Sequence, residues 1–166
     1  DGNVATRGTV AMTRSRDMVT WEILPPLEHD RVVEEMEVPQ IHSINGRWYL
    51  VFCTLGSLLA PEIARRFEGA VPTQSNFSMV GDSPLGPFRL HGTGEIMPQA
   101  PPCHFYASQL VCLGEKWFLL GTVRDDEGTA VYGAEVMLLR GETPVVVVDT
   151  DRDKNCVRRI IAFYAG

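Results

Sequence analysis

A single Asn-Gly pair, Asn45-Gly46, lies between two runs of strand-forming residues and constrains the fold more than any other feature of the chain. Both central residues of a tight two-residue hairpin turn need positive φ angles, which Asn and Gly adopt readily. The run before the turn covers residues 37–42. The run after it, residues 47–52, is apolar and rich in aromatic and branched side chains. The sequence therefore predicts an antiparallel hairpin here.

Two segments recur later in the chain with the same order of apolar, aromatic and turn residues, at a period of about 68 residues. Residues 10–21 align with residues 77–88, and Trp48 of the predicted hairpin aligns with Trp117. Units of four strands are typical of propellers, in which each blade is a small antiparallel sheet packed against the next. The repeat therefore predicts an all-β chain built from propeller blades.

The repeat predicts about two and a half four-stranded antiparallel blades within a single partial propeller domain over residues 1–166. One short helix is expected at residues 61–67, because proline at position 61 suits a first helical turn. The recurring aromatic side chains are expected to pack between blades: Trp21, Trp48, Phe88 and Trp117. The expected parts are a half blade at 7–27, a blade at 37–97, a blade at 105–149, and a tail at 150–166 whose pattern fits either a helix or a strand.

Composition narrows the classes of partner. The 166 residues are 45% hydrophobic and carry a formal charge of −6, with no cluster of Lys and Arg, which argues against a nucleic-acid partner. No apolar run approaches the roughly 20 residues of a membrane helix, so no membrane association is expected. The sequence shows no signal peptide and does not begin with Met, so we expect a fragment or a processed product.

The cysteines and histidines predict neither disulfides nor a metal site. The four cysteines show no Cys-x-x-Cys spacing, and Cys53 and Cys112 lie in apolar runs that predict buried free thiols. This pattern favours a reducing compartment such as the cytoplasm. His42 and His104 share no ligand spacing with another His or Cys, so no metal and no cofactor are expected.

Three segments resemble the five-bladed β-propeller glycosidases, namely glycoside hydrolase family 32 and the related families 43 and 68. Residues 15–22 resemble the Ser-x-Asp-Leu-x-x-Trp segment on the outer strands of a blade. Residues 37–41, with the hairpin that follows, resemble the segment that carries the general acid/base glutamate. Residues 105–109 resemble the Phe-Tyr-Ala segment that opens the next blade. The likeness covers about residues 7–150, the middle and later blades, and implies a five-bladed propeller.

The resemblance implies that Glu37 is the general acid/base of glycoside hydrolysis, and it makes Tyr106, Gln109 and His104 candidates for sugar contacts. An aromatic ring and an amide suit ligands rich in hydroxyl groups. The chain departs from the family at Val38, where family 32 usually has Cys, and at His104, where an Asp often stands. Neither the nucleophile Asp nor the Arg-Asp-Pro segment of the family has a match. Because hydrolysis needs two carboxyl groups, we expect this chain to be inactive by itself.

Two functions stay open from the sequence. The first is a glycoside-hydrolase-like propeller that binds carbohydrate at Glu37. The second is a non-catalytic carbohydrate-binding or structural propeller module from a truncated or mobile gene. The missing nucleophile favours the second function for this chain, and the recognisable Glu37 segment favours the first for its origin. Half blades leave sheet edges that pair with other chains, so we also expect a homodimer that completes the ring.

Overall fold

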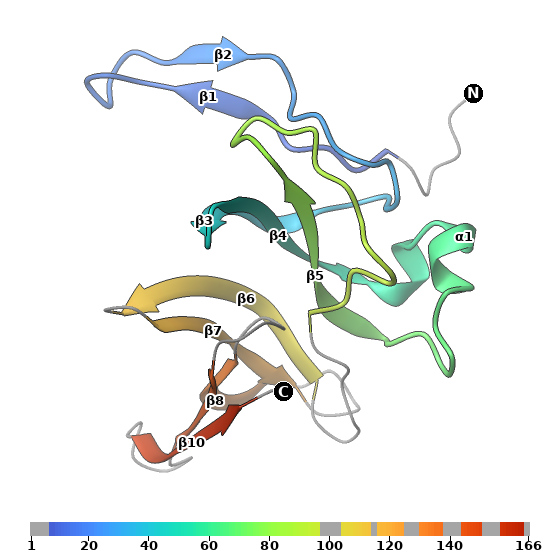
Figure 1. The fold of residues 1–166 in the computed structure, drawn as a ribbon, viewed down its shortest axis with the longest axis vertical. Coiled ribbons are helices and arrows are strands. Elements are labelled where there is room, and N and C mark those ends of the chain that lie inside the picture. The colour runs from blue at the N-terminus through green and yellow to red at the C-terminus, as the bar shows by residue number, and fades with distance from the viewer. Residues whose placement is uncertain are drawn as a thin grey trace.

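The computed structural model describes residues 7–96, 104–113, 116–124, 130–137, 144–150 and 157–164, and strands dominate there (Figure 1). In chain order the elements are β1 (Met12–Arg14), β2 (Glu22–Leu24), β3 (Glu37–Ile44), β4 (Arg47–Leu55), the 3₁₀ helix η2 (Gly56–Leu58), α1 (Pro61–Ala64), β5 (Gln74–Gly81), β6 (His104–Leu113), β7 (Lys116–Arg124), β8 (Ala130–Met137), β9 (Pro144–Thr150) and β10 (Val157–Tyr164). The all-β prediction is confirmed, and the part of the tail left open by the sequence contains a strand.

The strands form four antiparallel sheets that follow one another along the long axis of the molecule (Figure 1). Their orders are β1-β2, β3-β4-β5, β6-β7-β8 and β10-β9. Isolated bridges between Val80 and Arg89 and between Phe77 and Glu95 add a fourth segment beside β5. This segment does not form a continuous ladder, because Gly92 adopts a positive φ of 58° and the chain turns there. The predicted antiparallel blades are thus confirmed, with an irregular outer strand.

The predicted Asn-Gly hairpin is present and joins β3 to β4. Asn45 and Gly46 have φ angles of 50° and 78°, as a tight hairpin turn requires. Ile44 lies directly opposite Arg47, so the turn contains only the two expected residues. The turn fixes the register of the strand pair and thereby places Glu37 opposite Cys53 at the far end of the hairpin.

The internal repeat holds at the level of strand register. Trp48 of β4 lies opposite Ser43 of β3, and Trp117 of β7 lies opposite Cys112 of β6. Trp117 also packs edge-on against His42 of β3, with ring centroids 5.2 Å apart. The two hairpins are therefore equivalent parts of neighbouring sheets, and Trp117 contacts the sheet that precedes its own.

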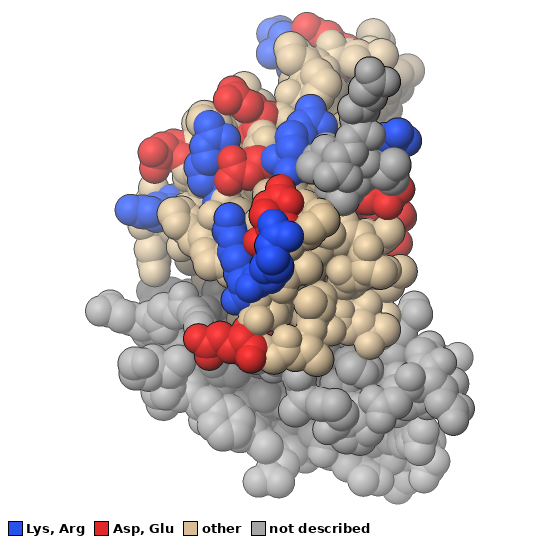
Figure 2. Space-filling view, turned by 90° about the vertical axis from the view of Figure 1, so that its right-hand side faces the viewer, with Lys and Arg blue, Asp and Glu red and all other residues tan. Residues whose placement is uncertain are grey.

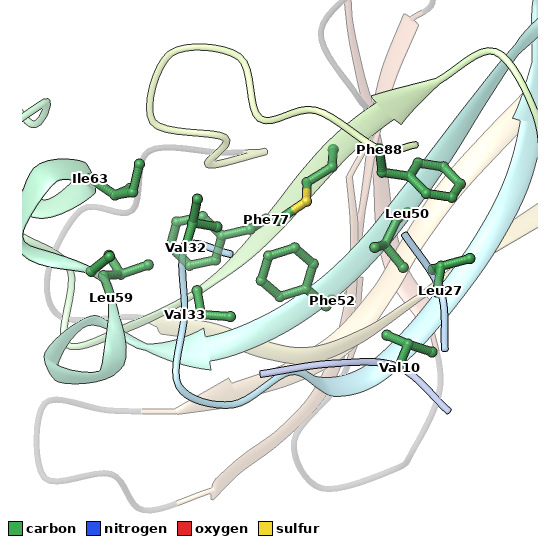
Figure 3. Close-up of a cluster of buried hydrophobic side chains, with 12 residues drawn as sticks. Val10, Leu27, Val32, Val33, Leu50, Phe52, Leu59, Ile63, Phe77 and Phe88 are labelled. Atoms are coloured by element: carbon green, nitrogen blue, oxygen red, sulfur yellow. The ribbon is translucent and has the colours of Figure 1, made fainter. Parts of the chain in front are cut away.

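The main hydrophobic core lies between the β3-β4-β5 sheet and the chain segments that cross one face of it (Figure 3). Alternate residues of β4 and β5 point into this core, as the two-residue period of a strand requires. Trp48 is partly buried against it. The buried members are Val10, Leu27, Val32, Val33, Leu50, Phe52, Leu59, Ala60, Ile63, Phe77, Met79 and Phe88.

Two side chains depart from the predicted packing. Trp21 aligns with Phe88, but Trp21 is 50% exposed whereas Phe88 is fully buried. Phe88 is covered by the extended segment at residues 27–30, because its amide donates to the carbonyl of Glu28 at 2.9 Å and its carbonyl accepts from Asp30 at 3.0 Å. Nothing in the described residues covers Trp21 in this way. Cys112 is exposed rather than buried, while Cys53 is buried as predicted.

The predicted helix is present but shorter than expected. Helix α1 begins at Pro61, which occupies its first turn, and ends at Ala64. Beyond it, the amides of Arg66 and Phe67 bond to carbonyls three residues back, which tightens the chain and stops the helix. Ile63 is buried in the core, so the helix serves to close one end of it.

Gly56, between β4 and α1, lies too close to a neighbouring loop to tolerate a side chain. A Cβ at this position would lie 1.9 Å from the carbonyl oxygen of Pro72. We expect Gly56→Ala to lower the free energy of unfolding by about 2 kcal/mol or more, because backbone must move to relieve the contact. Gly69→Ala is the control, because a Cβ there meets nothing within 4 Å. Urea denaturation of both variants tests this, and equal stability of the two would contradict the packing at Gly56.

Acidic and basic side chains lie interspersed on the face shown in Figure 2. Among the ion pairs of the described residues, Arg89 lies 3.0 Å from Asp30 and Arg14 lies 2.7 Å from Glu22. Both pairs are largely exposed, and such pairs contribute little to stability. In the described part of the chain, no helix has the length and apolar character needed to cross a bilayer.

Candidate functional site

Glu37 is the first residue of β3 and lies where the strand pairing is interrupted. The register of β3 against β4 shifts between Glu37 and Gln40, which marks a bulge. Val38 within this bulge has a φ of 48°, an uncommon conformation for a branched residue. Bulges redirect side chains at the ends of strands and often lie beside active sites. The bulge thus places the Glu37 carboxylate, which is half-buried, at the edge of the sheet that faces β6.

The following sheet contains the same bulge at the equivalent position. The register of β6 against β7 shifts between Tyr106 and Gln109, and Ala107 has a φ of 50°. Tyr106 lies 69 positions after Glu37, so the two side chains occupy equivalent sites in neighbouring sheets. The repeat therefore places a carboxylate near the beginning of β3 and a phenol near the beginning of β6.

Two neutral donors contact the Glu37 carboxylate. The Tyr106 hydroxyl donates a hydrogen bond to Oε2 of Glu37. The thiol of Cys53, directly opposite on β4, lies 3.9 Å from the same oxygen and 3.6 Å from the Glu37 carbonyl. Cys53 comes from the adjacent strand, so a sulfur contacts this glutamate even though Val38 stands where family 32 usually has Cys.

Both donors keep their protons at neutral pH. Burial, together with the hydrogen bond to Glu37, raises the pKa of the Tyr106 phenol far above its ordinary value. Burial raises the pKa of the Cys53 thiol to about 11. Because protonated groups can donate, both side chains are suited to donate hydrogen bonds to the Glu37 side chain.

The structure brings together only some of the residues predicted for the site. Glu37 and Tyr106 are in contact, whereas Gln109 is exposed further along β6. His104 begins β6 opposite Arg124, and its side chain lies outside the described residues. Among the described residues, no three His, Cys, Asp or Glu side chains cluster closely enough to hold a metal ion.

Several polar residues near Glu37 were not predicted from the sequence. Gln40 reaches from β3 to the backbone of β6, where it contacts Ser108 at 2.8 Å and Leu110 at 2.7 Å. Asn76 of β5 accepts a hydrogen bond of 3.2 Å from the amide of Ser108. These contacts join separate sheets, so only the strand register and the arrangement of the sheets reveal them. The only signal in the sequence is the run of three polar residues at 74–76, which begins the otherwise largely apolar strand β5.

A separate open hollow of about 500 Å³ lies on the turn between β1 and β2 and is lined by Arg14, Asp17 and Trp21, among others. The amides of Thr20 and Val19 donate to the Asp17 carboxylate and hold its pKa at about 2. Asp17 therefore stabilises its own turn as a permanent carboxylate. It belongs to the β1–β2 turn and does not contact Glu37.

No protein-family model and no curated protein matches the chain. Solved structures match it in fold. A levansucrase from Bacillus subtilis matches with a TM-score of 0.60 and 18% identity over 93% of this chain and 36% of the enzyme. An inulosucrase from Halalkalicoccus jeotgali bound to kestose matches with a TM-score of 0.62 and 20% identity over 97% of this chain and 43% of that protein. A levansucrase from B. megaterium matches with a TM-score of 0.56, 17% identity, and coverage of 98% and 36%.

The chain spans about two fifths of the length of these proteins, and the likeness extends over nearly all of its own residues. Levansucrase and inulosucrase are family 68 propeller glycosidases, one of the families that the sequence segments resemble. At such low identity, the match shows architecture. The chain therefore shares the β-propeller fold of these proteins.

Proposed function

We propose that this chain is a glycoside-hydrolase-like propeller protein that binds carbohydrate at Glu37. The observation that carries the proposal is the contact between the Glu37 carboxylate and the Tyr106 hydroxyl at equivalent bulges of neighbouring sheets. A carboxylate placed by a bulge beside protonated donors is suited to accept hydrogen bonds from sugar hydroxyl groups, and a carboxyl group at this position is suited to donate a proton to a glycosidic oxygen. In this proposal, Glu37 has the role of the general acid/base.

The same geometry favours binding over hydrolysis. Retaining hydrolysis uses two carboxyl groups about 5–5.5 Å apart, one as nucleophile and one as acid/base. The contacts of Glu37 in the described structure are with Tyr106 and Cys53, and neither is a carboxyl group. We therefore propose that the chain binds sugars without cleaving them when it acts alone.

The proposed ligands are carbohydrates that contain fructosyl units. The inulosucrase that matches the fold was solved bound to kestose, and a matching levansucrase was solved with sucrose. Gln109 offers an exposed amide on the same strand as Tyr106, and His104 precedes both on β6. In this proposal, the Gln109 amide and the His104 imidazole extend the sugar contacts beyond the Glu37 carboxylate.

A second candidate function is a carbohydrate-binding or structural module without catalysis. The feature that favours it is the Tyr106 hydroxyl, which already occupies one oxygen of Glu37. A sugar must therefore displace this hydroxyl or bind beside it. A purely structural module would bind none of the sugars tested.

A turnover assay tests the proposed role of Glu37. We expect the purified chain to release no product above background from sucrose, kestose, or arabinosyl and xylosyl nitrophenyl glycosides, because one carboxyl group cannot serve as both nucleophile and acid/base. Glu37→Gln is the test variant and Glu35→Gln, at an exposed position two residues away, is the matched control. Turnover that survives Glu37→Gln would sink the assignment of this residue. Turnover lost only in Glu37→Gln would show that a second carboxyl group completes the site.

Dimerisation is part of the proposal, with a second copy of the chain as the partner. Four apolar side chains on the β1–β2 hairpin, here named the hairpin patch, are each at least half exposed: Met18, Val19, Trp21 and Ile23. Phe88, which aligns with Trp21, is covered by the extended segment at residues 27–30. Strand edges and apolar faces of this kind pair with other chains, and two-fold dimers are the commonest closed assembly.

Light scattering at micromolar concentration tests the dimer. We expect light scattering to give twice the chain mass of 18.4 kDa. A stable dimer of this kind would bury at least about 2,000 Å² in total. Ile23→Lys, within the hairpin patch, should convert the dimer to a monomer. Leu85→Lys, at an exposed apolar position outside the patch, should not. A monomeric wild-type chain would refute the dimer.

A further inference from the structure

The side chain of Gln40 forms two hydrogen bonds with the backbone of the neighbouring sheet, and the proposed sugar site does not use them. It lies on β3 directly after the bulge at Val38, and its side chain crosses to β6 in the next sheet. Its Oε1 accepts a hydrogen bond of 2.7 Å from the amide of Leu110, and its Nε2 donates one of 2.8 Å to the carbonyl of Ser108. A side-chain amide thus pairs with the strand backbone as another strand would, with one donor and one acceptor.

A second side chain holds the same part of β6. Asn76 of β5 accepts from the amide of Ser108 at 3.2 Å, so the amide and the carbonyl of Ser108 are each held by a different strand. Ser108 is buried, as is Leu110. A buried backbone group that loses its partner destabilises the local structure, so these contacts fix where β6 lies relative to β3.

This part of β6 leads directly to Tyr106. Tyr106 precedes Ser108 by two residues on β6, and its hydroxyl reaches from this sheet to the Glu37 carboxylate on β3. Hydrogen bonds weaken steeply when the donor and acceptor move apart or turn away from each other. A slip of β6 along β3 by one residue, about 3.3 Å, would separate the Tyr106 hydroxyl from Glu37.

We propose that Gln40 is the positioning residue for the Glu37 site, because its amide locks β6 against β3 and so keeps the Tyr106 hydroxyl on the Glu37 carboxylate. The inference rests on the proposed function for the sugar-binding role of Glu37. The geometry of Gln40, β6 and Tyr106 does not depend on that function. Gln40 does not contact Glu37 through a hydrogen bond of its own. It acts on Glu37 through the backbone of β6.

The internal repeat supplies a matched control. Gln109 follows the bulge of β6 as Gln40 follows the bulge of β3, with Gln40 opposite Val51 and Gln109 opposite Leu120. Gln109 is exposed, whereas Gln40 is partly buried against β6. The same substitution at the two glutamines therefore changes the same side chain in the same strand position, with and without the cross-sheet contact.

The test compares Gln40→Met with Gln109→Met by hydrogen exchange and by titration of isotope-labelled tyrosines. Methionine keeps the length of glutamine and removes both the donor and the acceptor. In Gln40→Met, the amide of Leu110 should exchange at least about tenfold faster, while amides in the centre of β4 keep their protection. Burial and the hydrogen bond to Glu37 raise the pKa of the Tyr106 phenol above the ordinary tyrosine value of about 10, and in Gln40→Met this pKa should fall toward that value.

Gln109→Met should change neither measurement. A folded Gln40→Met chain with unchanged Leu110 exchange and unchanged Tyr106 titration would overturn the proposal. Gln40→Glu keeps an acceptor for Leu110 but places a carboxylate oxygen against the Ser108 carbonyl, and it should give a change of the same kind. If both variants unfold, Gln40 holds the fold rather than the site, and the proposal fails. Neither readout uses a sugar, so failure of sugar binding in the wild type would refute the proposed function without affecting this result.

Discussion

Replacing Phe52 with alanine is expected to lower the free energy of unfolding by about 3–5 kcal/mol, a large part of the 5–15 kcal/mol typical of a folded domain. Phe52 lies in the middle of β4, is 1% exposed, and stacks on Phe77 of β5 with ring centroids 5.9 Å apart (Figure 3). Alanine would remove the apolar area buried by the ring and leave a cavity that the surrounding strands can close only in part. Chemical denaturation followed by tryptophan fluorescence measures the change.

Leu85→Ala is the control for this core substitution. Leu85 is a large apolar residue but is 58% exposed, so its truncation should change stability by no more than about 0.5 kcal/mol. Similar losses in the two variants would mean that the core lies elsewhere. An unfolded Phe52→Ala chain would agree with the upper end of the expected range.

The second large effect concerns sugar affinity. Glu37→Ala is expected to weaken kestose binding by about 10- to 100-fold, because hydrogen bonds to a charged group contribute about 1.5–3 kcal/mol each. The substitution also removes the partner of the buried Tyr106 hydroxyl, so thermal unfolding must be measured alongside to separate lost affinity from lost folding. Isothermal titration with wild type and variant gives the ratio of affinities.

Glu35→Ala is the matched control for affinity. Glu35 is exposed, has the same charge as Glu37, and precedes the strand by two residues. It should leave the affinity for kestose unchanged, because solvent screens its charge. Equal losses at the two positions would indicate a general effect of negative charge and would remove the argument for a site at Glu37.

The sequence predicted local features that depend on a few neighbouring residues. The Asn45-Gly46 turn predicts the hairpin, and the repeat predicts equivalent positions for Trp48 and Trp117, as the strand registers show. These predictions were reliable because turn geometry and the two-residue strand period leave few alternatives. The helix was predicted too long, because the sequence does not show that the chain tightens after Ala64.

The sequence could not predict contacts between sheets. Glu37 and Tyr106 were singled out separately, but only the arrangement of β3 and β6 shows that their side chains meet. Gln40 was missed because glutamine is common on strand surfaces, and its role depends on the distance to the backbone of Ser108. Trp21 was expected to be buried because it aligns with Phe88, but burial depends on a neighbouring segment that the alignment does not contain.

The most direct test of the sugar site at Glu37 is a titration of kestose into the isotope-labelled protein, followed residue by residue in NMR spectra. The account predicts that the largest shifts lie at Glu37, Gln40, Tyr106 and Gln109, around the contact between β3 and β6. Largest shifts at Arg14, Asp17 and Trp21 would place the sugar in the hollow of the β1–β2 turn instead. That result, or no shifts at millimolar kestose, would contradict the proposed site.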